Sequence, residues 1–243
     1  CRPKALAAAE RLKEINPEIQ VEPCIEDVRP ENILSLSTDC DLILDGLDNF
    51  ETRYLINDVA VKTGLPYIYA GAIGTEGLVM PILPKSGGSG SITWPESEAT
   101  PCLRCVFPEP PSPGSSPTCD TAGILGPTIG TVAAHQTAIA MSLLVGRLEQ
   151  TDRSLHTMDP WNGINRRMAT GDPRSDCPCC ENKQFEWLDG NRISSTDSIC
   201  GREVVQIRPR TGGTVDLLAL RTHLKNAGDV RGDAHAVQVD IQE

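Results

Sequence analysis

The first 74 residues alternate between helix-like and strand-like patterns. In the helix-like stretches apolar side chains recur every three to four positions, and in the strand-like stretches they form short continuous runs. Because these strands are apolar on both faces, the pattern predicts an α/β fold with a mostly parallel sheet and helices on both faces. The predicted order is helix 4–15, strand 19–25, helix 29–37, strand 40–48, helix 49–64 and strand 66–74.

The middle of the chain predicts an antiparallel extension of this sheet. A strand over 75–84 follows the previous strand with no helix between them, so the two strands should run antiparallel. A polar Gly/Ser loop (85–101) and a Pro-rich segment (106–118) come next. One long apolar helix is expected within 124–148, and a strand pair around "DPWNG" within 154–170.

The last part of the chain predicts a small α+β module outside the sheet. Asp216 is a suitable N-cap for its helix, and Gly228 is a suitable end. We therefore expect a first domain over residues 1–190 and a separate module over residues 195–243. The elements of the module are expected at 202–207 (strand), 214–228 (helix) and 235–241 (strand).

Both ends of the sequence are interpreted as truncated. The chain begins with Cys1 rather than methionine and enters a helix at once. It ends with "HAVQVDIQE", which stops within a strand-like alternation. Residues that are essential to function can therefore lie outside these 243 positions.

Composition and charge narrow the class of protein. With 39% hydrophobic and 23% charged residues, the chain lies in the range of globular proteins. Its formal charge of −11 argues against binding nucleic acid or an anionic membrane through bulk charge. No apolar stretch reaches the roughly 20 residues of a membrane span, and no secretory signal opens the chain. We therefore predict a cytoplasmic protein with neither a membrane nor a nucleic acid as partner.

Two close cysteine pairs favour a metal site. Cys102 and Cys105 form one CxxC motif, the first knuckle, and Cys177 and Cys180 form another, the second knuckle. Two intervening residues let both thiolates reach one zinc ion at about 2.3 Å, and two such pairs fill its four positions. Four thiolates leave no position for water, so we predict structural zinc. Cys179, inside the second pair, leaves the choice of ligands open there.

A redox pair and disulfide bonds are the two alternatives to a zinc site for these cysteines. A redox pair of the thioredoxin type belongs at a helix start beside its first strand, which neither CxxC matches, and disulfides are disfavoured in a reducing compartment. Cys24, Cys40 and Cys200 are interpreted as packing residues. His135, on the long helix, is interpreted as a core or helix-surface residue rather than a catalyst.

The stretch "LILDGLDNFETR" (42–53) ends a strand with two carboxylates, Asp45 and Asp48. In sheets with parallel strands, ligands bind at the carboxyl ends of those strands. A carboxylate there can hold Mg²⁺ that bridges nucleotide phosphates. Asp48 is equally suited to cap the helix that begins near Asn49, and position alone does not separate the two roles. Asp45 is interpreted as structural.

Six motifs occur along the chain from about residue 2 to about residue 188. They are "RPKALAAAERLKEINP", "DLILDGLDNFETRYLIND", "YAGAIGTEGLVMPILP", "PCLRCVFP", "TCDTAGILGPTIGTVAAHQTAIAMSLLVG" and "CPCC". In order and spacing this set resembles the ThiF/MoeB/HesA family, the bacterial relatives of ubiquitin-activating enzymes. The resemblance implies a Rossmann-like fold and an adenylyltransferase. Such enzymes use MgATP to adenylate the C-terminal glycine of a ubiquitin-like sulfur-carrier protein and release pyrophosphate. Sulfur transfer then serves thiamine or molybdopterin synthesis.

The resemblance also implies roles for single residues. Lys4, in the "PK" motif, would contact the ATP phosphates. Asp48, in the "DN" motif, would act on Mg²⁺ and the phosphates. Asn49 and Arg53 follow it in register and are further candidates for binding the cofactor. Cys119 stands where some members keep a cysteine for sulfur or acyl transfer, but a bystander loop cysteine is an equal alternative. The zinc ligands of the family match Cys102, Cys105, Cys177 and Cys180.

The sequence departs from the family in one respect. The glycine-rich nucleotide loop, the acidic residue that binds ribose and the arginines that bind phosphates lie upstream of the "PK" lysine, and none is present. No GxGxxG occurs, and "SGGSG" (86–90) follows late strands without opening a helix. We therefore predict that this fragment alone is not competent, while its full-length parent is the enzyme.

Three hypotheses of function follow from the sequence. The first is the adenylyltransferase, working as a homodimer with a sulfur-carrier protein and a sulfurtransferase as partners. The second is a non-catalytic, zinc-stabilised scaffold that binds a carrier protein or a sulfurtransferase. A dinucleotide-dependent oxidoreductase is disfavoured because the zinc pairs and the lysine and aspartate motifs have no place in it. The role of the C-terminal module is left open between carrier docking and dimer packing.

Overall fold

The computed structural model describes residues 2–85, 87–89, 92–111, 119–192, 196–199, 204–207, 215–226, 228–232 and 237–240. The chain divides into two compact units. The first comprises Cys1–Asp27 and Pro209–Glu243, and the second comprises Val28–Arg208. This division does not test the domain boundary expected at 190–195, which stays a prediction.

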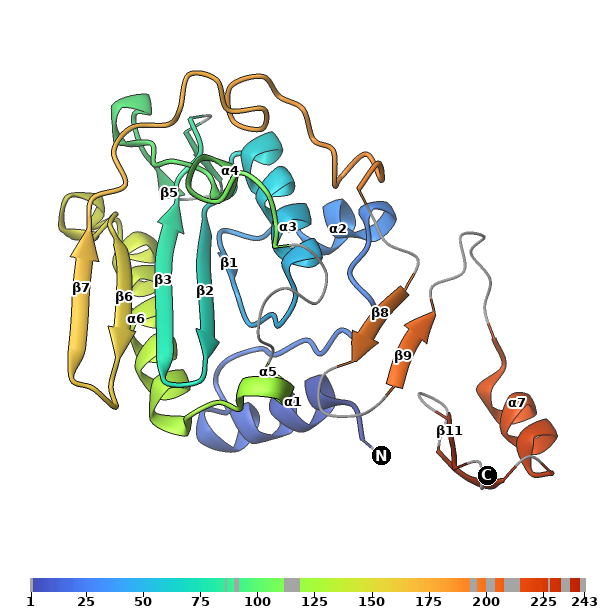
Figure 1. Ribbon diagram of the computed structural model, residues 1–243. Helices are drawn as coiled ribbons and strands as arrows, with labels where there is room; N and C mark the ends of the chain where they lie inside the picture. Colours follow the sequence, from blue (N-terminus) through green and yellow to red (C-terminus); the bar gives the residue numbers. More distant parts are fainter. Residues whose placement is uncertain are drawn as a thin grey trace. The chain divides into compact units, whose positions relative to one another are not determined.

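The second unit is built on a five-stranded sheet of order β1-β2-β3-β6-β7 (Figure 1). The antiparallel turn expected near residue 74 is confirmed, and so is the strand pair around "DPWNG". β1 pairs with β2 in parallel, and the pairs β2–β3, β3–β6 and β6–β7 are antiparallel. The strands are β1 (Ile43–Leu44), β2 (Tyr67–Ile73), β3 (Glu76–Ile82), β6 (Leu155–Asp159) and β7 (Ile164–Met168).

The sheet has fewer parallel strands than the sequence pattern predicts. The mixed α/β class is confirmed, but within the described part of the chain only β1 and β2 are parallel neighbours. The predicted strand 19–25 is wrong, because this stretch carries no strand, and strand 40–48 shrinks to Ile43–Leu44. A strand needs a neighbour for its backbone groups, which 19–25 lacks here, and Pro23 removes one donor.

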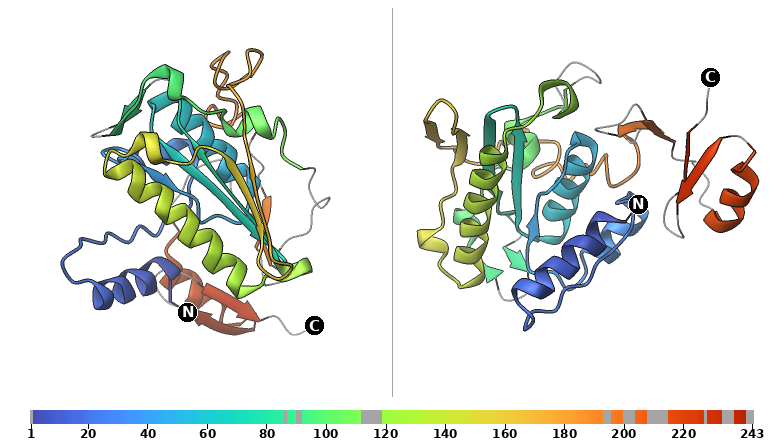
Figure 2. Two further views of the ribbon diagram at one scale, coloured as in Figure 1. Left: turned by 90° about the vertical axis from the view of Figure 1, so that its left-hand side faces the viewer. Right: turned by 90° about the horizontal axis from the view of Figure 1, so that it is seen from below.

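Two helices cover opposite faces of the sheet (Figure 2). The alternation of β2 explains why, because Tyr67 and Tyr69 point into the core under α3 (Phe50–Thr63), while Ile68 and Ala70 point into the core under α6 (Gly126–Leu144). At Gly77 on β3, a Cβ atom would collide with Val132 of α6, so glycine permits this close packing.

Local signals set the helix ends. Asn49 caps α3. Gly64 ends the helix in the left-handed conformation (φ 81°), as predicted. α2 (Pro30–Leu36) packs on α3. The smaller elements of this unit are β4 (Gly88–Ser89), β5 (Ile92–Thr93), η1 (Glu96–Glu98), α4 (Leu103–Val106), α5 (Cys119–Ala122), η2 (Leu148–Gln150), β8 (Thr196–Ile199) and β9 (Val204–Ile207).

The first unit contains α1 (Lys4–Ile15) and a C-terminal helix and hairpin. Asp216 caps α7 (Leu217–Leu224) by accepting hydrogen bonds from two backbone N–H groups, as predicted, but the helix ends four residues before Gly228. The hairpin pairs β10 (Asp229–Gly232) with β11 (Val237–Asp240) and packs on α7. Of the helices in the described residues, none is both long enough and apolar enough to span a bilayer.

Candidate functional site

The two aspartates in the loop between β1 and α3, residues 45–49, lie in different environments. The Asp45 carboxylate is buried and accepts hydrogen bonds from the Tyr67 hydroxyl (2.6 Å) and the Leu47 N–H (2.9 Å). Asp48 is exposed. The cap of α3 is Asn49, whose side chain accepts a hydrogen bond from the Thr52 N–H at 2.8 Å. The alternative that Asp48 caps the helix is therefore wrong, because it lies one residue too early.

Arg53 turns inward and binds this loop. Its Nε donates to Asp45 at 3.1 Å, and its Nη2 donates to the Leu47 carbonyl at 2.6 Å and the Ala70 carbonyl at 3.0 Å. The guanidinium also lies over the ring of Tyr69 at 5.4 Å. A direct contact between Arg53 and a nucleotide stays a prediction.

Burial keeps the hydroxyl of Tyr67 protonated. Desolvation, helped by the negative charge of Asp45, raises the pKa of Tyr67 well above its usual value. The tyrosine therefore remains a hydrogen-bond donor to Asp45 throughout the physiological pH range. The carboxylate of Asp45 is satisfied by these contacts, which supports the structural interpretation of this residue.

The other predicted site residues lie elsewhere. Lys4 opens α1 in the first unit and is exposed, whereas Asp48, Asn49 and Arg53 belong to the second unit. A joint ATP site of Lys4 and Asp48 thus stays a prediction. Cys119 begins α5, and its side chain lies outside the described residues, as does Cys200.

The segment after Cys119 is attached to the turn at the carboxyl end of β2. The Gly74 N–H donates to the Gly123 carbonyl at 3.0 Å, and the Leu125 N–H donates to the Gly74 carbonyl at 2.8 Å. Because β1 and β2 are parallel, their carboxyl ends point toward the same edge of the sheet. The Cys119 segment and the loop of Asp48 therefore both belong to this edge.

The predicted four-cysteine cluster is present, with all four side chains buried. The sulfur atoms lie within 4.8 Å of one another, with Cys102 at 3.6 Å from Cys177 and Cys105 at 3.4 Å from Cys180. Tetrahedral zinc bonds of about 2.3 Å place neighbouring sulfur atoms about 3.8 Å apart. The cluster therefore fits one tetrahedral metal ion.

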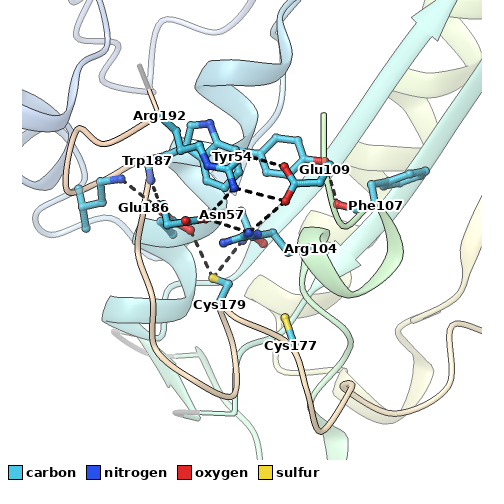
Figure 3. Close-up of polar contacts among 12 residues, drawn as sticks. Tyr54, Asn57, Arg104, Phe107, Glu109, Cys177, Cys179, Glu186, Trp187 and Arg192 are labelled. Atoms are coloured by element: carbon cyan, nitrogen blue, oxygen red, sulfur yellow. Dashed lines mark hydrogen bonds and ion pairs between the residues drawn. The ribbon is translucent and has the colours of Figure 1, made fainter. Parts of the chain in front are cut away.

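Cys179 is not one of the four cysteines of this cluster, and its thiol contacts α3. Its thiol donates to Asp58 Oδ1 at 3.3 Å and accepts from the Asn57 amide at 3.3 Å (Figure 3). The same Asn57 accepts from the Leu103 N–H at 2.8 Å. Among the described cysteines, the four-sulfur cluster contains Cys177 and Cys180 and leaves out Cys179. This supports Cys177 and Cys180 as the ligands of the second CxxC pair, and the choice of ligands stays a prediction.

Asn57 and Asp58 were not found by sequence reasoning. Both are fully buried, and Asp58 also accepts from the backbone N–H groups of Trp187 (3.0 Å) and Leu188 (3.3 Å). One turn of α3 therefore holds both cysteine knuckles and the segment that follows them. The available signal was two adjacent polar residues inside the apolar helix "YLINDVAV".

Two arginines flank the indole of Trp187 (Figure 3). The guanidinium of Arg104 lies 4.8 Å from the ring and that of Arg192 lies 5.4 Å from it. Arg104 pairs with Glu186 at 3.0 Å, and Arg192 pairs with Glu109 at 2.8 Å. These contacts bind the segment after the second knuckle to the segment of the first knuckle.

Comparison with known protein families matches residues 1–179 to the ThiF family. The chain belongs to the ThiF family. The resemblance stated from the sequence motifs is therefore confirmed. The sulfur carrier protein ThiS adenylyltransferase of Bacillus subtilis is 37% identical over 227 residues, which cover 93% of this chain and 62% of that relative.

Two further relatives come from an archaeon and a fungus. The SAMP-activating enzyme E1 of Haloferax volcanii is 35% identical and covers 73% of this chain and 60% of its own length. The adenylyltransferase and sulfurtransferase uba4 of Aspergillus niger is 34% identical, with coverages of 82% and 41%. The chain thus spans between 41% and 62% of the length of these three relatives.

Solved structures support the fold of this ThiF family chain. E. coli MccB, in a crystal structure with ATP, matches with a TM-score of 0.56 at 15% identity. The match covers 74% of this chain and 51% of MccB. At this identity the likeness concerns the fold alone.

Asp58→Asn is expected to change how stability depends on pH. Burial raises the pKa of Asp58 from 3.8 to about 6 in the folded protein. Stability from this group is therefore complete below pH 4 and is lost as the pH rises to 6, by roughly 3 kcal/mol. The free energy of unfolding of the wild type relative to the variant should fall across this window and stay level above it. Urea unfolding from pH 4 to 8 measures this difference.

The control for this experiment is Asp189→Asn, which changes an exposed carboxyl in the same segment. It should follow the pH dependence of the wild type. Because the wild type and the variants have the same cysteines, the contribution of thiol titration cancels in the difference between their free energies of unfolding. A difference between wild type and Asp58→Asn that is constant from pH 4 to 6 would contradict the raised pKa.

Proposed function

We propose that the full-length protein that contains this chain is an adenylyltransferase. It activates the C-terminal glycine of a ubiquitin-like sulfur-carrier protein with MgATP, in a thiamine or molybdopterin type of pathway. The relatives named as sulfur-carrier adenylyltransferases support this proposal. The structural observation that carries it is Asp48, which is exposed after the carboxyl end of β1 and is freed from helix capping by Asn49.

The proposed reaction joins two anions. A carboxylate oxygen of the carrier bonds to the α-phosphorus of ATP, and pyrophosphate leaves with the electrons of the bond that breaks. Such a step requires charge neutralisation and alignment of the reactants. Lys4 supplies a compact positive charge for the phosphates, and Asp48 supplies a carboxylate for Mg²⁺. Asn49 supports Asp48 by capping α3.

The cysteines have separate roles in this proposal. The cluster of Cys102, Cys105, Cys177 and Cys180 holds structural zinc, which its sulfur geometry supports. Cys119 is a candidate thiol for sulfur or acyl transfer, with a bystander role as the alternative. A homodimer, a sulfurtransferase partner and a cytoplasmic location complete the proposal. The lack of activity of the isolated chain also stays a prediction.

A second candidate function is a non-catalytic, metal-stabilised scaffold that binds a carrier protein or a sulfurtransferase. The observation that favours it is the buried four-cysteine cluster, which would hold a metal for the fold without taking part in catalysis. A scaffold would bind the carrier without turning over ATP. Exchange of pyrophosphate into ATP therefore distinguishes the two candidates, because only the enzyme would catalyse it.

Carrier-dependent exchange of labelled pyrophosphate into ATP tests the proposed function. We expect the full-length protein to catalyse this exchange only when Mg²⁺ and a carrier protein with its C-terminal glycine are present. The control is the same carrier without that glycine, which offers no carboxylate at the required position. Carrier binding by calorimetry without any exchange would reject the enzyme and favour the scaffold.

A further inference from the structure

The loop that carries Asp48 is held by buried side chains from three elements. Arg53 of α3 and Tyr67 of β2 both bind the Asp45 carboxylate, at 3.1 and 2.6 Å. Gln136 of α6 donates from Nε2 to the Asp45 carbonyl at 3.0 Å and to the Ile68 carbonyl at 2.9 Å. The first residue of the loop is therefore fixed through both its side chain and its backbone.

Arg53 fixes the loop at a second point. Besides Asp45, it binds the carbonyl of Leu47, the residue directly before Asp48, at 2.6 Å. It also binds the Ala70 carbonyl of β2 at 3.0 Å. A lysine has one nitrogen and cannot reach these acceptors in the same fork geometry. The guanidinium thus sets the path of the backbone into Asp48.

Stability alone gives little reason for such a network. The side chains of Arg53 and Asp45 are 9% and 0% exposed, and burying an ion pair costs about as much solvation as the pairing returns. What the network does provide is one fixed backbone path. A metal-binding carboxylate requires such precision, because ligand groups must be held within about 0.5 Å of their productive position.

We propose that Asp45, Arg53 and Tyr67 are positioning residues that hold Asp48 in the orientation that binds Mg²⁺ together with ATP. This inference rests on the proposed function. It gives Arg53 an indirect role, in place of a direct contact with the nucleotide. Asp48 remains the residue that touches the metal.

The test measures how strongly Mg²⁺ raises the affinity for ATP. Calorimetry of the full-length protein without carrier gives the dissociation constant of ATP in excess Mg²⁺ and in EDTA, and their ratio is the readout. Arg53→Lys keeps the charge but loses the fork. It should lower this ratio about tenfold, as is typical when a residue behind a metal ligand is changed, and leave the EDTA affinity unchanged.

A matched pair of tyrosine variants tests the same role with less disturbance of the packing. Tyr67→Phe removes the hydroxyl bound to Asp45. Tyr54, whose residue exposure is also 0%, donates to the Phe107 carbonyl at 2.8 Å, and Tyr54→Phe removes that hydroxyl. Both variants keep the ring and its packing. Tyr67→Phe should lower the Mg²⁺ ratio at least about threefold, whereas Tyr54→Phe should not change it. If Arg53→Lys does not fold, this pair decides.

The dependence on Asp48 is the last arm of the test. Asp48→Ala should reduce the ratio close to one, and adding Arg53→Lys to it should change nothing further. A full ratio in both Arg53→Lys and Tyr67→Phe, with the ratio lost in Asp48→Ala, would overturn the positioning role and leave the proposed function intact. A wild type that shows neither Mg²⁺-dependent ATP binding nor exchange would overturn both.

Discussion

Replacing Cys177 by serine is expected to remove the metal and strongly destabilise the protein. Cys177 is fully buried at 3.6 Å from Cys102, and the loss of its thiolate leaves three ligands for a metal that requires four. Loss of a structural metal is among the changes that cost about 4 kcal/mol or more. For a chain of this size, that lowers the melting temperature by roughly 10 °C. Elemental analysis and calorimetry measure the two effects.

Cys179→Ser is the matched control within the same knuckle. A serine hydroxyl keeps the donor that binds Asp58, and Cys179 lies outside the cluster. We expect about one metal ion per chain and a melting temperature close to that of the wild type. The assignment is wrong if Cys179→Ser loses the metal while Cys177→Ser keeps it, or if the wild type is metal-free and insensitive to chelators.

Features that depend on neighbouring residues could be predicted from the sequence. Gly64 ends α3 because its backbone takes a left-handed conformation, and Asp216 caps α7 because its side chain reaches N–H groups two and three residues later. The CxxC spacing belongs to the same class, since two residues bring both sulfur atoms of a pair to one point.

Features that depend on distant partners could not be predicted. The environment of Asp45 differs from that of Asp48 because Arg53 and Tyr67, 8 and 22 residues beyond Asp45, both donate to its carboxylate. Cys179 accepts a hydrogen bond from Asn57, which lies 122 residues away in the sequence. No spacing rule contains this information. The apolar alternation near residues 19–25 failed for the related reason that a strand needs a neighbouring strand.

Helix α3 connects the two candidate sites of the second unit. Asn49, Arg53 and Asn57 are four residues apart, and this spacing places them along one side of the helix. The first caps the helix beside Asp48, the second holds the loop, and the third holds the knuckles. The segments that carry the four cysteines are therefore tied to the helix whose beginning positions Asp48, while Asp48 itself is not one of the four cysteine-cluster residues.

Asp48→Ala is accordingly expected to abolish function without disturbing the fold. Because Asp48 is exposed and Asn49 supplies the cap, the variant should keep its metal and its melting temperature. Carrier-dependent exchange of pyrophosphate into ATP should fall at least about 100-fold, the loss typical of removing one group that stabilises charge in a transition state. The assay uses the full-length protein at several Mg²⁺ concentrations.

Asp48→Asn separates the charge of this residue from its shape. The amide keeps the size of the side chain but lacks the negative charge that Mg²⁺ prefers, so exchange should fall nearly as far as in the alanine variant. Asp189→Ala, which changes an exposed aspartate in the segment after the knuckles, should exchange like the wild type. Normal exchange by Asp48→Ala would refute the role proposed for this carboxylate. A loss of exchange that comes with loss of the metal would instead assign Asp48 to the fold.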